Sequence, residues 1–241
     1  MLRHIPLGRM YNLRDLGGYP VLNGGETAWE QLLRGDNPED LTEKDLQWLL
    51  ERGITTVVDL RSEAEIRQRA DQLSGQGGFH YIHCPLLEED RMPNLEDDVG
   101  AGYFHVLEGK ERMARALRAV ASAPRGVLFH CTAGKDRTGL ISALLLGLAG
   151  VERADLLADY QVSETYLAEV ISKIRAKVPE LTAFAGASKA AYLDRCLDLL
   201  EEKYGSVCGY LQAIGLTEET LDALRGKLLP ESNPVGGTAV G

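Results

Sequence analysis

The sequence predicts an α/β fold with a mainly parallel, doubly wound sheet flanked by helices and a helical C-terminal half. Two observations predict this fold class. Short β-branched runs alternate with amphipathic segments as far as Val151, and this alternation favours βαβ units with a parallel sheet. Beyond Val151 the apolar residues recur at helical spacing, without a convincing strand pattern. We therefore expect the functional groups at the carboxyl ends of the strands.

The first elements along the chain are short. Glycines and Pro20 between Tyr11 and Asp36 predict turns and short strands. Thr42 and Asp45 have the spacing of a helix cap, and leucines follow at helical spacing until Gly53, which predicts a helix over 43–52. After that, strands are predicted over 54–60, 79–84 and 126–131, and helices over 63–72 and 111–123.

The segments after Val151 predict a series of helices. They are expected over 154–160, 164–177, 189–203, 207–214 and 218–228. Gly215 and Thr217 are suited to stop one helix and to cap the next. Because no obvious linker precedes this helical half, we predict a single domain over residues 1–230. Residues 231–241 are predicted to form a flexible tail.

Charge and apolar patterning exclude several classes of function. The chain has 26 Lys and Arg against 36 Asp and Glu, a formal net charge of −10. Nucleic acids and anionic membranes would be repelled by this charge, so neither is predicted as a general partner. The N-terminus lacks the apolar run of a secretory signal, and the apolar stretch over 140–151 is shorter than the roughly 20 residues that span a membrane. We therefore predict no integral membrane segment.

Cysteine and histidine usage predicts neither disulfides nor a metal. The four cysteines form no CxxC pair, which indicates a reduced setting and predicts a cytoplasmic protein. His80 and His83 are three residues apart on a predicted strand, so their side chains fall on opposite faces. No zinc or calcium spacing is found along the sequence, and we predict no cofactor.

The most informative segment is GVLFHCTAGKDRTG, residues 126–139. It predicts a strand, a turn that Gly134 permits, and a helix that begins near Arg137. In such a turn successive N–H groups converge on the positive end of the helix dipole, which makes a phosphate site. The planar fork of Arg137 matches two phosphoryl oxygens. A cysteine in this field ionises readily, so Cys131 is the predicted nucleophile.

Other residues of this segment have predicted supporting roles. The predicted substrate-binding residues are His130, Thr132, Ala133, Gly134, Lys135 and Thr138. Thr138 can donate its hydroxyl toward the sulfur, whereas His130 is expected to order the loop backbone. Lys135 is expected to face the substrate. Asp136 is either a brace for Arg137 or a group that transfers protons. Asp59, at the carboxyl end of a strand, either acts in catalysis or caps a loop.

The segment HCTAGKDRTG also resembles the Cys-x5-Arg-Ser/Thr signature of the protein tyrosine phosphatase superfamily. The closer resemblance is to atypical bacterial tyrosine phosphatases, on the elements NLRDLGGY at 12–19, DLRS at 59–62 and ADYxxS at 158–163. This resemblance implies a metal-free phosphomonoesterase that forms a phosphocysteine intermediate, with broad specificity in some members. Some relatives carry a long helical insertion over the site, whereas only residues 88–102 are available here, so no large lid is expected. Arg14 and Asp15 are expected to pair internally.

Three sources of a general acid remain open: Asp136, Asp59 and the acidic run over 88–90. Asp136 lies inside the predicted phosphate site. The order DRT also resembles lipid phosphatases of the myotubularin and Sac types, in which the loop itself is thought to supply the acid. We therefore predict Asp136 as the acid. Asp59 is second, as an acid or as a group that orients the loop.

The predicted function is a cysteine-dependent phosphomonoesterase that releases inorganic phosphate from a phosphorylated protein or a phosphoinositide. Lys135 is an additional cation that could meet a second phosphate on an inositol ring. A rhodanese-like sulfurtransferase is the enzymatic alternative, but the five-residue gap between Cys131 and Arg137 favours a phosphoryl group. A phosphate-binding pseudophosphatase is the non-catalytic alternative.

Overall fold

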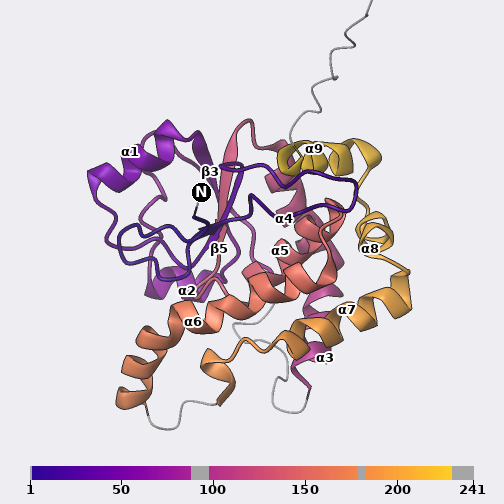
Figure 1. Ribbon diagram of the computed structural model, residues 1–241. Coiled ribbons are helices and arrows are strands. Elements are labelled where there is room, and N and C mark those ends of the chain that lie inside the picture. The colour runs from indigo at the N-terminus through magenta and orange to yellow at the C-terminus, as the bar shows by residue number, and fades with distance from the viewer. Residues whose placement is uncertain (1, 88–97, 179–182, 230–241) are drawn as a thin grey trace, which may run out of the picture.

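Figure 1 shows the computed structural model, which describes residues 2–87, 98–178 and 183–229. A sheet lies at its centre with the strand order β1-β2-β5-β3-β4. The strands are β1 (Arg14–Asp15), β2 (Leu32–Gly35), β3 (Ile54–Asp59), β4 (His80–His83) and β5 (Gly126–His130). Strands β2, β5, β3 and β4 run parallel, and β1 pairs antiparallel with β2 at the edge. The prediction of a mainly parallel sheet is confirmed.

Helices make up most of the remaining described residues (Figure 1). They are α1 (Glu43–Glu51), α2 (Glu63–Gln68), α3 (Val99–Leu107), α4 (Lys110–Ser122), α5 (Asp136–Leu148), α6 (Arg153–Lys177), the short 3-10 helix η1 (Ala183–Gly186), α7 (Ala190–Tyr204), α8 (Val207–Ala213) and α9 (Glu218–Leu228). The helical C-terminal half is therefore confirmed. No helix of the described ranges is both long enough and apolar enough to cross a membrane.

Both faces of the sheet are covered by apolar side chains. On one face Leu49 of α1 belongs to a buried cluster with Leu33 and Val57 of the sheet. On the other face Phe129 belongs to a larger cluster that includes residues of α4, α5 and the C-terminal helices. Helix α5 is buried along most of its length, because its sequence is apolar on all sides. The segment that joins β5 to α5 is thereby held between two buried elements.

The structure corrects the prediction at α6. Two helices, over 154–160 and 164–177, were expected, but Arg153–Lys177 is one continuous helix. The intervening residues 161–163 contain neither glycine nor proline, so nothing in the backbone stops the helix. Ser163 is fully buried and accepts a hydrogen bond from Arg14, which fixes the middle of α6 against β1.

Two further helices differ from expectation. Helix α3 was not predicted, because Gly100 and Gly102 lower its helix propensity. It forms because Asp98 caps its first turn and it packs along α7, where a side chain at position 100 would strike Arg195. Helix α2 ends at Gln68 rather than at the predicted residue 72. The acidic run over 88–90 and the predicted tail over 231–241 lie outside the described residues.

Candidate active site

Residues 131–137 join the end of β5 to the first turn of α5. We call them the phosphate-binding loop, after the role that the sequence predicts for them. Strand β5 lies between β2 and β3, so the loop opens at the middle of the sheet's carboxyl edge. Cys131 is 2% exposed. Helix α5 begins at Asp136, and its N-terminus has no side-chain cap. The unpaired amides of that first turn are therefore available to an anion.

The carbonyl groups of the loop are turned toward buried donors. The amide of Asn12 donates to the carbonyls of Ala133 and Gly134, at 2.9 and 3.0 Å. Arg34 Nη2 donates to the carbonyl of Gly134 at 2.8 Å. In a trans peptide the C=O and the following N–H point in opposite directions. The N–H groups of Gly134 and Lys135 therefore point away from these donors, toward the open side of the loop.

The backbone conformation at position 134 and its close packing, rather than a role in the reaction, require a glycine there. Its φ is +63°, in the left-handed region that favours glycine. A Cβ at this position would lie 2.4 Å from the carbonyl carbon of Gly35 and 2.6 Å from the amide nitrogen of Asp36. The loop therefore packs directly on the end of β2, and glycine is the residue that allows this approach.

A buried charge cluster beneath the loop joins three elements. Asp159 of α6 pairs with Arg14 of β1 at 2.8 Å and also with Arg34 of β2. All three side chains are almost fully buried. Burial lowers the pKa of Arg34 to about 10, with Arg14 adding to the effect, whereas the two arginines outweigh burial and lower the pKa of Asp159 to about 2. Two cations against one anion give this three-residue cluster a net charge of +1.

Glu65 of α2 orients the loop arginine. Its two carboxylate oxygens accept from Arg137 Nη1 and Nη2, at 2.5 and 2.6 Å, and it also accepts from the hydroxyl of Thr132. Arg137 overcomes the effect of burial and lowers the pKa of Glu65 to about 2. A guanidinium has five N–H donors. After this pairing, Arg137 still has the N–H of Nε and one on each terminal nitrogen for a ligand.

Asp136 and Lys135, which are adjacent in the sequence, have different surroundings. Tyr103 of α3 donates to Asp136 Oδ1, and the hydroxyls of Tyr103 and Tyr160 lie 2.6 Å apart. The Asp136 side chain is 17% exposed, so it is partly accessible to solvent. Lys135 is 3% exposed, and its ammonium donates to the carbonyls of Phe184 and Ala187, at 3.0 and 2.8 Å. That ammonium is therefore directed at η1 rather than at the open side of the loop.

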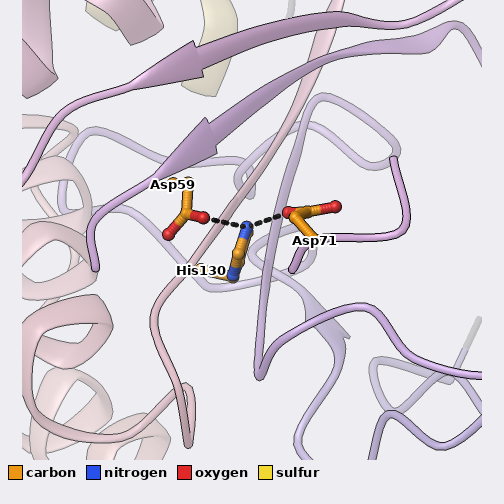
Figure 2. A group of neighbouring side chains, drawn as sticks. All are labelled: Asp59, Asp71 and His130. Carbon is orange, nitrogen blue, oxygen red and sulfur yellow. Dashed lines mark ion pairs between the residues drawn. The ribbon is translucent and has the colours of Figure 1, made fainter. Parts of the chain in front are cut away.

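A second buried cluster, shown in Figure 2, lies behind the loop and comprises Asp59, Asp71 and His130. His130 Nε2 lies 2.7 Å from Asp71 and 3.9 Å from Asp59. Burial opposes the charged imidazole, but the two carboxylates raise the pKa of His130 above its ordinary value. Burial likewise opposes the charge of Asp59, yet His130 and the paired Arg61 hold the pKa of Asp59 well below its ordinary range.

The same three residues are close enough to be considered as metal ligands. The oxygens of Asp59, however, already accept from the side chains of Arg61 and Tyr81. His130 Nε2 and Asp71 Oδ2 lie 2.7 Å apart as an ion pair, and neither atom makes a hydrogen bond among the described residues. Because the Asp59 oxygens are engaged in this way, the described residues fit a buried ion-pair cluster better than a cation site.

The structure thus brings the predicted loop residues together and shows partners that the sequence did not reveal. Thr138 is fully buried, and among the described residues its hydroxyl has no hydrogen-bond partner. His130 Nδ1 lies 3.2 Å from the carbonyl of Cys131, which agrees with a role in ordering the loop backbone. Asn12 and Glu65 were not predicted. The capping box with Ser62 fixes Glu65 on the first turn of α2, but it gives no signal of a partner in the loop.

The chain is similar to known phosphatases. Residues 5–230 match the profile described as the tyrosine phosphatase family. A tyrosine-protein phosphatase of Nostoc commune is 32% identical over 212 residues, which cover 78% of this chain and 70% of the relative. The triple specificity protein phosphatase PtpB of Mycobacterium tuberculosis is 28% identical over 228 residues, which cover 73% of this chain and 83% of the relative.

Two solved structures are also similar. The structure of P. aeruginosa TpbA is 17% identical, with a TM-score of 0.34, and the match covers 81% of this chain and 84% of that one. The core catalytic domain of the PP-IP phosphatase SIW14 from S. cerevisiae is 18% identical, with a TM-score of 0.40, and covers 74% of this chain and 98% of that one. The profile match over residues 5–230 is decisive: the chain belongs to the tyrosine phosphatase family.

Proposed function

We propose that this protein hydrolyses phosphotyrosine in proteins through a phosphocysteine intermediate on Cys131. The observation that carries the proposal is the phosphate-binding loop, whose carbonyls are held by Asn12 and Arg34. Its N–H groups, the uncapped N-terminus of α5 and the +1 charge of the cluster of Arg14, Arg34 and Asp159 together favour a dianionic phosphoryl group in front of the cysteine.

In the first step the sulfur of Cys131 attacks phosphorus, and the bond between phosphorus and the tyrosine oxygen breaks. Arg137 holds two phosphoryl oxygens with the donors that Glu65 leaves available. Asp136 gives its proton to the leaving oxygen, so that tyrosine leaves as a neutral phenol. Tyr103 holds Asp136 through Oδ1, which leaves Oδ2 to face the leaving group.

In the second step water attacks the phosphocysteine. Asp136, now a carboxylate, takes a proton from that water, and the bond between phosphorus and sulfur breaks to release inorganic phosphate. The unpaired hydroxyl of Thr138 donates to the sulfur as it regains its negative charge. Asp59 serves in this scheme as a group that orients the loop through His130, because its low pKa and its partners disfavour a proton on it.

Phosphoinositide hydrolysis is a second candidate activity. The name of the Mycobacterium tuberculosis relative indicates that a related phosphatase has three specificities. In this chain the ammonium of Lys135 lies 3.6 Å from Asp136 Oδ1, and both residues belong to the loop. Its ammonium would have to leave the carbonyls of Phe184 and Ala187 in order to meet a second phosphate. If phosphoinositides are substrates, replacing Lys135 should therefore change the turnover of phosphoinositide and that of phosphotyrosine by different factors.

We also propose a reducing, cytoplasmic setting. The four cysteines Cys84, Cys131, Cys196 and Cys208 are all unbridged. A thiolate nucleophile needs such a setting, because oxidation would consume it. Cell fractionation with an antibody against the chain tests this assignment, and recovery of the protein from an oxidising compartment would contradict it.

The proposed activity is tested with a small aryl phosphate and a phosphotyrosine peptide in buffer that contains a chelator. The parent should hydrolyse both, and Cys131→Ser should retain vanadate binding while its rate falls by about a thousandfold or more. An absolute need for a divalent cation would contradict the proposal. Binding of a phosphopeptide without any turnover by the parent would favour a pseudophosphatase. Transfer of sulfur from thiosulfate to cyanide in place of hydrolysis would favour a sulfurtransferase.

A further inference from the structure

A cavity of about 480 Å³ opens beside the phosphate-binding loop and reaches Thr132 and Ala133. We call it the α6 groove. One wall is formed by the N-terminal segment and the ends of β2 and α2, with Arg9, Tyr11 and Arg69. The other wall is the C-terminal half of α6. Figure 1 labels this helix. None of the proposed catalytic steps uses this space, although it is continuous with the loop that would hold the phosphoryl group.

The α6 wall presents aliphatic side chains to the groove. Leu167 is buried, Val170 and Ile171 are half-buried, and Ile174 is 40% exposed. Few branched apolar side chains among the described residues are as exposed as Ile174, and Ile174 lines the cavity. This wall can bury an aliphatic group of a ligand.

The groove is also positively charged, in a chain whose net charge is −10. Four cations line it, Arg9, Arg69, Lys173 and Lys177, against the carboxylates Asp36 and Glu39. Both carboxylates are already engaged. Asp36 accepts from the backbone amides of residues 11 and 12, and Glu39 pairs with Arg69 at 2.9 Å.

Arg9 and Lys173 each pair with a surface carboxylate, and these carboxylates do not compete strongly with a ligand for the two cations. Arg9 pairs with Asp40 and Lys173 with Glu169, and in both pairs the two side chains are more than half exposed. Exposed pairs of this kind contribute little to stability. An acidic ligand in the groove could therefore recruit both cations at small cost.

The dimensions favour a peptide over a membrane surface. Leu167 and Ile174 are seven residues apart on α6, about 10 Å along the helix. An extended peptide advances about 3.3 Å per residue, so the wall matches roughly three residues. A concave site beside the loop suits side chains that flank a phosphorylated residue, whereas a flat bilayer cannot enter it.

We infer that the α6 groove binds the segment that flanks phosphotyrosine in the protein substrate and selects acidic and aliphatic residues there. The cations of the groove take the carboxylates, and Ile174 with its neighbours takes the aliphatic side chain. This inference rests on the proposed function and adds a preference for the sequence around the phosphotyrosine. A small aryl phosphate occupies the loop alone and does not reach the groove.

The test compares Lys173→Glu and Lys177→Glu with Lys44→Glu, a matched reversal on the exposed surface of α1. The substrates are a phosphotyrosine peptide with Asp, Glu and Leu around the phosphotyrosine, the same peptide with Lys at its acidic positions, and a small aryl phosphate. Each groove reversal should lower kcat/KM for the acidic peptide by about fivefold, through KM, and should raise it for the basic peptide. Turnover of the aryl phosphate should stay unchanged for all three variants.

The inference would be overturned if a groove reversal changed kcat/KM equally for the peptide and the aryl phosphate. It would also be overturned if Lys173→Glu lowered kcat/KM for the acidic peptide no more than Lys44→Glu does. If the same variants, assayed on phosphoinositide vesicles as a further substrate, changed turnover of the vesicles alone, the inference would also be overturned, in favour of a lipid. If the parent hydrolysed no phosphotyrosine substrate, the proposed function would fail. Fluorescence anisotropy with the unphosphorylated acidic peptide would then decide whether the groove binds such a peptide. Weaker binding by Lys173→Glu than by Lys44→Glu supports it, and equal binding refutes it.

Discussion

Replacing Glu65 with glutamine tests how the loop arginine is positioned. Arg137 lowers the pKa of Glu65 from 4.5 to about 2, although burial opposes this. Such a difference corresponds to roughly 3 kcal/mol of stability. Because the folded-state pKa is the lower one, this stability is present above pH 4.5 and is lost as the pH falls toward 2. An amide retains part of the hydrogen bonding, so we expect Glu65→Gln to cost about 2 kcal/mol at pH 7.

The same change should also affect turnover. With the amide in place of the carboxylate, Arg137 loses its ionic partner and its fixed orientation, so kcat/KM for an aryl phosphate should fall about tenfold to a hundredfold. Glu63→Gln on the same helix is the control, since Glu63 is exposed and lies 3.9 Å from Arg67. Urea unfolding and initial rates at pH 7 measure both quantities. If the two variants had the same stability and kcat/KM, Glu65 would have no positioning role.

Three other changes test the remaining groups of the loop. Arg137→Lys should weaken both vanadate binding and turnover, because an ammonium cannot make the bidentate contact, and a variant with parental vanadate affinity would contradict this. Asp136→Asn should lose the basic limb of the pH–rate profile and slow a poor leaving group about a hundredfold more than a good one; equal losses would make Asp136 a structural brace. Lys135→Ala should reduce phosphoinositide turnover more than phosphotyrosine turnover, and equal losses would remove the argument for lipid specificity.

The sequence was sufficient to predict the fold class and the turn that joins β5 to α5. The strand that ends at His130, the turn with Gly134 and the helix that follows are local features, and their spacing determines their geometry. The caps at Thr42 and Thr217 were predictable for the same reason, and both are present in the structure. The features that could be predicted are therefore those that residues close together in the sequence determine.

The partners of the loop could not be predicted, because they come from distant segments. Asn12 contacts a carbonyl 121 residues away, and Glu65 pairs with an arginine 72 residues away. In the sequence Glu65 lies in a charged helix that resembles a solvent-exposed surface. Only the packing of α2 against the loop turns that carboxylate inward.

Lys135 illustrates a different difficulty. Its position in the loop suggested a cation that faces the substrate, but the direction of a long side chain depends on which acceptors are nearest. The carbonyls of Phe184 and Ala187 are brought to it by η1, about 50 residues along the chain. The sequence offered no signal for that contact, because backbone carbonyls are present at every residue.

The covalent step on Cys131 is tested most directly by quenching the parent protein with a denaturant at alkaline pH during turnover of a small aryl phosphate. With a good leaving group, hydrolysis of the intermediate limits the rate, so the intermediate should accumulate. We expect mass spectrometry of the digested protein to find one phosphoryl group on the peptide that contains Cys131, and none on that peptide in Cys131→Ser. Steady turnover with no phosphoryl group on the Cys131 peptide, or with the group on another residue, would contradict the mechanism.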